Sequence, residues 1–167
     1  FLSTLGTKVY IVEKTDRLLP NHDHEVGELM EKVLGDQKGV TTLTHSRVIS
    51  ITKSGLQKRV IVSRAETEKS FNVDEILVAV GKEPNVDMGL ENAGVKYTPK
   101  GIEVNDHLQT NIKHIYATGD VLGYEGIKHI ALSQSQVAAN NIFGRDKIVP
   151  DFTATPEVLF TSPNIAT

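Results

Sequence analysis

Cysteine is absent from the 167-residue chain. Its absence excludes a disulfide scaffold, a thiolate zinc site and a cysteine nucleophile among these residues. The absence also fits a reducing compartment, and we therefore expect a cytoplasmic location.

Long apolar runs and a dominant charge sign are lacking as well. The longest purely apolar runs, such as residues 76–80, are too short to cross a bilayer. No basic segment followed by an apolar one opens the chain, so no signal peptide is predicted. The 18 basic residues face 21 acidic ones, a net charge of −3. This balance excludes a basic field for nucleic acid and an acidic disordered tail, and we expect neither nucleic acid nor membrane as a partner.

What is present is ordinary globular composition, with 39% hydrophobic and 23% charged residues. A chain of this length can bury a sizeable core. The chain starts at Phe1 rather than at methionine and has no closing element before Thr167. We expect a piece of a longer polypeptide.

The first half alternates between two periodicities. Residues 8–13 are β-branched and apolar and predict a strand. An amphipathic helix follows, with Asp23 as its N-cap and Gly35 as its end. Two-residue alternation in residues 40–44, 47–52, 57–63 and 69–73 predicts a small antiparallel meander. Residues 75–80, which are apolar after Glu75, predict a central parallel strand.

The second half contains shorter elements. Residues 89–94 predict one helical turn, residues 102–104 and 115–117 two short strands, and residues 130–143 a long helix closed by Gly144. A new strand starts at residue 158. Alternating strands and helices predict an α/β fold with a mostly parallel sheet.

Glu13 ends the first predicted strand, which lies between the end of a helix predicted at residues 1–5 and the amphipathic helix. In a dinucleotide-binding βαβ unit an acid at this place accepts hydrogen bonds from the adenosine ribose and repels a 2′-phosphate, which favours NAD over NADP. The alternative is a solvated glutamate at a strand end. The adjacent Lys14 would soften the preference for NAD.

Gly119 and Asp120 follow the predicted strand at residues 115–117. Gly119 lets the backbone approach a ligand closely, and Asp120 would stand where open α/β sheets bind ligands. A carboxylate there can accept a hydrogen bond from a sugar-alcohol hydroxyl. The alternative is an aspartate in an ordinary turn.

Five segments in order resemble one family: KVYIVEKTDRLLP, DEILVAVGKEPN, TNIKHIYATGDV, KHIALSQSQVAANNIFG and PEVLFTSPNIA. They resemble the flavin-dependent pyridine nucleotide–disulfide oxidoreductases, and within them most the dihydrolipoamide dehydrogenases. The resemblance covers essentially the whole chain. It implies a Rossmann-like FAD/NAD(P)-binding fold, truncated at both ends, with a small antiparallel β-meander.

The resemblance also implies a domain plan. Residues 1–88 match the NAD-binding domain without its first strand and glycine loop, residues 89–150 match the second segment of the FAD-binding domain, and residues 151–167 match the start of the dimerisation domain. The implied cofactors are FAD and NAD. The implied cofactor-binding residues are Glu13 on the ribose, Val48 against the adenine, Ala79, Val80, Gly81 and Lys82 along the nicotinamide, Gly119 and Asp120 on the flavin ribitol, and Lys128 at the helix start that faces the flavin ring.

Two positions depart from the family pattern. Lys82 stands where the family usually has arginine, so the loop keeps a point charge but loses a planar fork. Lys128 stands where the family commonly has a small residue. The loop at residues 122–127, with two glycines, also differs from a compact version.

No catalytic residue and no metal ligand is assigned within the chain. The resemblance implies a Cys-x-x-x-x-Cys disulfide upstream of Phe1 and a His–Glu pair beyond Thr167, so none of the six histidines inherits that role. His22 and His24 form only a weak metal pattern. His129 opens the last predicted helix and contacts the flavin region at most through its backbone.

The implied enzyme oxidises a dithiol, either a small molecule or a lipoyl domain, and passes electrons through a disulfide and FAD to NAD. It is a homodimer, with a 2-oxoacid dehydrogenase complex as a partner, and this chain alone would be inactive and fold marginally. Alternatives in the same family are a soluble flavin transhydrogenase, a mercuric reductase or a glutathione-type reductase, the last opposed by Glu13. Outside the enzymes, the alternatives are a nucleotide-binding module without redox turnover and, as the simplest hypothesis, a structural protein.

Overall fold

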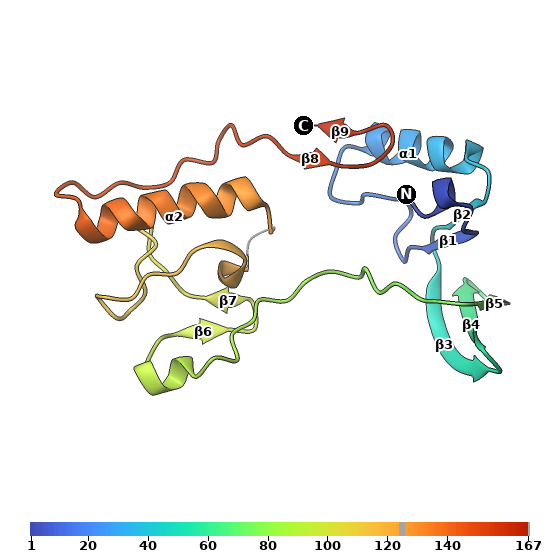
Figure 1. Ribbon diagram of the computed structural model, residues 1–167, viewed down its shortest axis with the longest axis horizontal. Coiled ribbons are helices and arrows are strands. Elements are labelled where there is room, and N and C mark those ends of the chain that lie inside the picture. The colour runs from blue at the N-terminus through green and yellow to red at the C-terminus, as the bar shows by residue number, and fades with distance from the viewer. Residues whose placement is uncertain (124–125, 167) are drawn as a thin grey trace. The chain divides into compact units, whose positions relative to one another are not determined.

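The computed structural model describes residues 1–123 and 126–166 and divides into two compact units, residues 1–79 and residues 80–167. Unit 1 contains the blue to green elements of Figure 1. These are the 3₁₀ helix η1 (Ser3–Leu5), β1 (Val9–Val12), α1 (His24–Asp36), β2 (Val40–Leu43), β3 (Arg47–Ser54), β4 (Gln57–Arg64) and β5 (Thr67–Val73).

The β1 and β2 strands form a parallel pair, with Val9 opposite Val40 and Val12 opposite Leu43. The prediction that residues 40–44 belong to the meander was therefore wrong. Parallel strands need a crossover connection, which α1 provides while packing against β2. The helix α1 starts after Asp23, as predicted, but it continues past the predicted end at Gly35 to Asp36. Gly35 has open space around it.

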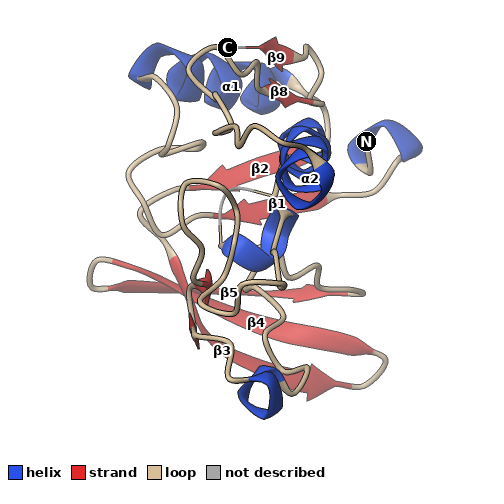
Figure 2. Cartoon of the chain, turned by 90° about the vertical axis from the view of Figure 1, so that its left-hand side faces the viewer, coloured by secondary structure: helices blue, strands red, loops and turns tan. Residues whose placement is uncertain are grey.

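The meander consists of β3, β4 and β5, which pair antiparallel in that order (Figure 2). Its tight turns join Ser54 to Gln57 and Arg64 to Thr67. Val60 and Val62 of β4 are buried. The rings of Tyr10 in β1 and Phe71 in β5 stack with centroids 4.5 Å apart, which ties the parallel pair to the meander.

Residues 75–80 do not form the predicted central strand. No strand among the described residues pairs with them, and Leu77 and Val80 are 80% and 91% exposed. A central parallel strand requires hydrogen-bonded neighbours on both sides. The prediction of a buried strand was therefore wrong, because the described residues contain no neighbouring strand to pair with this segment.

Unit 2 contains short elements and one long helix. They are η2 (Leu90–Ala93), β6 (Tyr97–Thr98), β7 (Gly101–Ile102), η3 (Gly119–Leu122), α2 (Lys128–Phe143), β8 (Val158–Leu159) and β9 (Ile165–Ala166). The β6–β7 and β8–β9 pairs are antiparallel. The helix α2 begins two residues before the predicted start and ends at the predicted Phe143.

The core of unit 2 lies where α2 and β7 meet η3. It contains Val95, Ile102, Leu108, Ala117, Leu122, Val137 and Ala138. Residues 115–117 do not form the predicted strand but make a single bridge, Tyr116 to Gln109. Leu108 adopts a left-handed φ of 64°, which breaks the extended partner segment and limits the pairing. Within the described residues, no helix combines the length and apolar character that crossing a membrane requires.

Candidate functional site

Glu13 lies where β1 ends, as predicted from its place in the sequence. Its backbone N–H donates to Leu43 O at 2.9 Å, and its carbonyl accepts the Ser46 N–H at 2.9 Å. These two bonds continue the β1–β2 ladder past the end of the strands. The half-buried Glu13 side chain therefore starts from a fixed backbone at the carboxyl edge of a parallel pair.

The Glu13 carboxylate is held by the residue two positions later. Its Oε1 accepts the Thr15 N–H at 2.8 Å and the Thr15 hydroxyl also at 2.8 Å. The hydrogen bond from the Thr15 N–H is the main reason that the pKa of Glu13 lies below its ordinary value. The Thr15 hydroxyl lowers this pKa further, whereas partial burial raises it. Glu13 is therefore an ionised acceptor with a defined orientation at neutral pH.

Val48 lies two residues after Ser46, whose N–H donates to the Glu13 carbonyl. It pairs with buried Val62, yet Val48 as a whole residue is 45% exposed. A β-bulge directly follows it, between Val48 and Ser50. Such bulges redirect side chains at sheet edges. The structure thus offers an accessible apolar side chain near the strand end that carries Glu13.

The predicted nicotinamide loop is an exposed, extended segment. Ala79 and Val80 are both exposed, and neither lines the pocket described below. Gly81 has a φ of 123°, which side chains disfavour. Of the four residues predicted for this loop, Lys82 lines that pocket and the other three do not.

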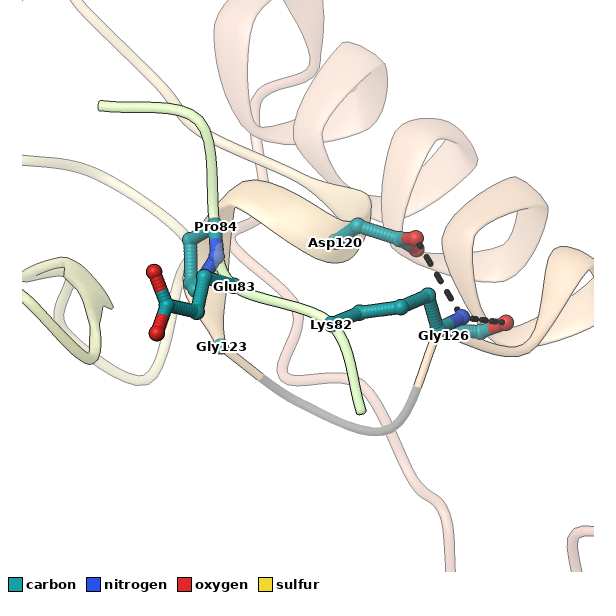
Figure 3. A pocket seen from close by; sticks show the side chains of 6 residues that line it. All are labelled: Lys82, Glu83, Pro84, Asp120, Gly123 and Gly126. Carbon is teal, nitrogen blue, oxygen red and sulfur yellow. Dashed lines mark hydrogen bonds and ion pairs between the residues drawn. The ribbon is translucent and has the colours of Figure 1, made fainter. Parts of the chain in front are cut away.

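A pocket of about 310 Å³ in unit 2 is lined by Lys82, Glu83, Pro84, Asp120, Gly123 and Gly126. Lys82 Nζ lies 3.8 Å from Asp120 Oδ2 and donates to Gly126 O at 3.3 Å. Figure 3 shows Lys82 reaching between these two partners while the Glu83 side chain points away from them. The structure therefore joins the loop at residue 82 to Asp120.

Two glycines leave one side of this pocket without side chains. A Cβ at Gly126 would contact Lys82 Nζ and Asp120 Oδ2 and would lie 2.9 Å from Asp120 Cγ. Gly123 has a φ of +75°, and a Cβ there would collide with the Lys100 backbone. The pocket thus combines a carboxylate, a cation and bare backbone, a donor and acceptor set suited to a polyhydroxy chain.

Gln134 in α2, which the sequence analysis did not single out, holds the backbone of the residue before Asp120. The N–H of Gly119 donates to Gln134 Oε1 at 2.6 Å, and Gln134 is completely buried. Gly119 has a φ of 78°, and a Cβ there would lie 3.3 Å from the Ala131 side chain. A glutamine within the apolar face of a helix was the available signal, because such a buried polar group needs a partner.

The N-terminus of α2 follows Gly126 by one residue. Ile127 is its N-cap and provides no capping side chain, and Lys128 and His129 are both exposed. Uncapped N–H groups give a helix start a partial positive charge. Lys128 does not line the pocket, so its predicted contact with a flavin stays a prediction. In the part of the chain that the structure describes, no three histidine or acidic side chains gather as a metal site.

Comparison with known proteins gives consistent matches. The family described as pyridine nucleotide–disulphide oxidoreductase matches residues 1–138. Dihydrolipoyl dehydrogenase of Bacillus subtilis is 38% identical over 97% of this chain, and mercuric reductase of Staphylococcus aureus is 33% identical over 98%. The chain spans 35% of the former relative and 30% of the latter.

Solved structures agree with the sequence relatives. The flavoprotein disulfide reductase RclA of Escherichia coli superposes with a TM-score of 0.84 at 26% identity, over 95% of this chain and 36% of that one. LpdA of Mycobacterium tuberculosis also gives 0.84, at 25% identity over 97% of this chain and 35% of that one. FAD and NAD are the cofactors of the matched family. The expected Rossmann-like α/β fold is thus confirmed, and the chain belongs to the pyridine nucleotide–disulphide oxidoreductase family.

Proposed function

We propose that this chain is part of an enzyme that oxidises a dithiol of the dihydrolipoamide type and reduces NAD through a disulfide and FAD. The dithiol would lose two electrons and two protons to become a disulfide. NAD would take up both electrons and one proton, and the second proton would be released. Within that enzyme, residues 1–88 would bind NAD, residues 89–150 would bind part of FAD, and residues 151–167 would begin the dimerisation domain.

The observation that carries the proposal is the ionised Glu13 carboxylate held at the end of β1. Two Thr15 donors at 2.8 Å fix its position. A carboxylate at this edge accepts hydrogen bonds from ribose hydroxyls and repels a 2′-phosphate. The exposed Val48 side chain would pack against the adenine, and Gly81 would let the backbone pass close to the nicotinamide.

The pocket of unit 2 fits the flavin part of the proposal. Asp120 would accept a hydrogen bond from a ribitol hydroxyl, and Gly119, Gly123 and Gly126 leave room for close approach. The uncapped α2 N-terminus would place partial positive charge beside the flavin, with Lys128 adding to it. FAD, when bound, supplies the two-electron chemistry that links a dithiol to NAD.

Two alternatives within the family remain distinguishable by substrate. The similarity to a mercuric reductase supports Hg(II) reduction as a second candidate, although that relative is 33% identical compared with 38% for the dihydrolipoyl dehydrogenase. A soluble transhydrogenase would exchange hydride between the two nicotinamide cofactors without a dithiol. A nucleotide-binding module would bind NAD without turnover.

The partners follow from the proposed chemistry. The dithiol would be a small molecule or the lipoyl group of a carrier domain, the latter within a 2-oxoacid dehydrogenase complex. The enzyme would be a homodimer in the cytoplasm, where thiols stay reduced.

The test uses the intact, FAD-loaded protein that contains this chain. We expect reduction of NAD by dihydrolipoamide, with little reduction of NADP, and loss of NAD affinity in the Glu13→Ala variant. Turnover with Hg(II) and NADPH, or NADPH-dependent reduction of an NAD analogue without dithiol, would instead support the alternatives. NAD binding without any turnover would support the module.

A further inference from the structure

Thr15 connects the Glu13 carboxylate to the rest of unit 1. Its N–H and hydroxyl both donate to Glu13 Oε1 at 2.8 Å, and its carbonyl accepts the His45 N–H at 2.7 Å. The Ser46 N–H in turn bonds to the Glu13 carbonyl at 2.9 Å. Residues 13, 15, 45 and 46 thus form one bonded turn, in which Thr15 is the half-buried residue that holds the acid.

The Thr15 hydroxyl has one hydrogen and two acceptors within reach. Glu13 Oε1 and Arg17 O both lie 2.8 Å from Thr15 Oγ1. An ionised carboxylate is a stronger acceptor than a peptide carbonyl, so the hydrogen points to Glu13. The hydroxyl and N–H of Thr15 then converge on one carboxylate oxygen, which limits rotation of the Glu13 side chain.

Limiting this rotation has a consequence for binding. A free glutamate loses rotamer entropy when a ligand fixes it, whereas a glutamate that is already held loses less. A held carboxylate also cannot swing away from an incoming phosphate. Fixing Glu13 therefore favours a ribose with free hydroxyls and opposes one that carries a 2′-phosphate.

Resting on the proposed function, we infer that Thr15 is a positioning residue that sets the preference for NAD over NADP by orienting Glu13. The neighbouring cation Lys14 is exposed and would attract a 2′-phosphate. Thr15 counteracts that attraction by keeping the carboxylate in place.

The experiment measures the dissociation constants of NAD and NADP by calorimetry on the intact, FAD-loaded protein. Thr15→Val removes the hydroxyl at nearly constant volume, and Thr15→Ser keeps it. Every variant retains the N–H at position 15, so the hydroxyl accounts for the difference. Thr41→Val, at an exposed position in β2, is the matched control. Thr15→Ala is a second hydroxyl-free variant should valine disturb folding.

We expect Thr15→Val and Thr15→Ala to lower the ratio of NADP to NAD dissociation constants about fivefold, the size of one hydrogen bond. Thr15→Ser and Thr41→Val should leave the ratio unchanged. An unchanged ratio in both hydroxyl-free variants would overturn the inference. Equal weakening of NAD and NADP would also overturn it, because a merely structural role predicts that result.

Glu13→Ala separates this inference from the proposed function. If Thr15 acts through Glu13, adding Thr15→Val to Glu13→Ala produces no further change in the ratio. A strong effect of Glu13→Ala with no effect of Thr15→Val sinks the inference alone. No effect of either substitution, or no NAD binding by the unsubstituted protein, sinks the proposed function.

Discussion

Lys82 Nζ lies 3.8 Å from Asp120 Oδ2 and bonds to the Gly126 carbonyl at 3.3 Å, so one lysine connects two segments that are distant in the sequence. An ammonium reaches the two oxygens as a point charge, whereas a guanidinium would present a planar fork. The contact therefore places a point-charge cation beside Asp120.

Replacing Lys82 should weaken FAD binding modestly. The Lys82 and Asp120 side chains are 70% and 63% exposed, and exposed ion pairs contribute about 0.2–1 kcal/mol. We expect Lys82→Met to raise the FAD dissociation constant about two- to fivefold in the intact protein, measured by flavin fluorescence. Lys82→Arg should retain the affinity. Lys113→Met, which removes an exposed charge elsewhere in unit 2, is the control, and an equal effect there would contradict a specific role for Lys82.

The two pocket glycines should respond differently to alanine. At Gly126 the added Cβ meets the mobile end of Lys82 and the Asp120 carboxylate, so these side chains can move at little cost in stability. At Gly123 it meets the Lys100 backbone in a left-handed conformation, which costs about 1–3 kcal/mol or more. Urea unfolding should show Gly123→Ala as clearly the less stable variant. Gly126→Ala should instead lower FAD affinity, and a similar loss of stability in both variants would contradict this distinction.

Gln134 should contribute to stability through the Gly119 N–H. Its Oε1 accepts that N–H at 2.6 Å; the Gln134 side chain is fully buried and Gly119 is partly buried. Gln134→Leu keeps the volume but leaves the partly buried Gly119 N–H without its acceptor, which costs about 1–3 kcal/mol. The free energy of unfolding in urea measures the loss. Ser135→Ala, at the exposed neighbouring position, should change it much less.

The sequence placed Glu13 correctly at the end of a strand but did not identify what holds either acid. The strand predicted before Asp120 does not form, and Asp120 lies in η3 instead. Thr15 and Gln134 were not identified from the sequence, because their roles depend on contacts that form only in the folded chain. A turn brings Thr15 to Glu13, and the packing of α2 brings Gln134 to Gly119. A threonine two residues after an acid has no distinctive pattern until the turn brings its hydroxyl to the carboxylate.

The errors in the fold have the same physical origin. Residues 75–80 are apolar enough for a buried strand, but pairing depends on neighbours that an apolar run does not specify. Residues 40–44 alternate like the meander that follows, yet they pair in parallel with β1 because α1 precedes them. Local pattern thus predicted the helices and the meander hairpins, where the contacts are near in sequence, and failed for strands whose partners are distant.

Glu13 should make stability depend on pH in a defined direction. The Thr15 N–H, with help from its hydroxyl, lowers the pKa of Glu13 in the folded state below its ordinary value of 4.5. A carboxyl group whose pKa is lower in the folded state stabilises the fold above its unfolded pKa. That contribution decreases as the pH falls below 4.5 and is lost once the pH passes the folded pKa. It should therefore be constant between pH 6 and pH 8.

Glu13→Gln tests this dependence because it removes the titration and keeps the shape. We expect the unsubstituted protein to lose more unfolding free energy than the Gln variant when the pH is lowered from 7 to 3. Thr15→Val should reduce the difference, since the Thr15 hydroxyl supplies part of the pKa shift. Urea denaturation at each pH measures these free energies, with Asp16→Asn as the control at a neighbouring exposed acid. Equal pH dependence in the Glu13→Gln variant and the unsubstituted protein would show that the Thr15 hydrogen bonds do not stabilise the ionised carboxylate.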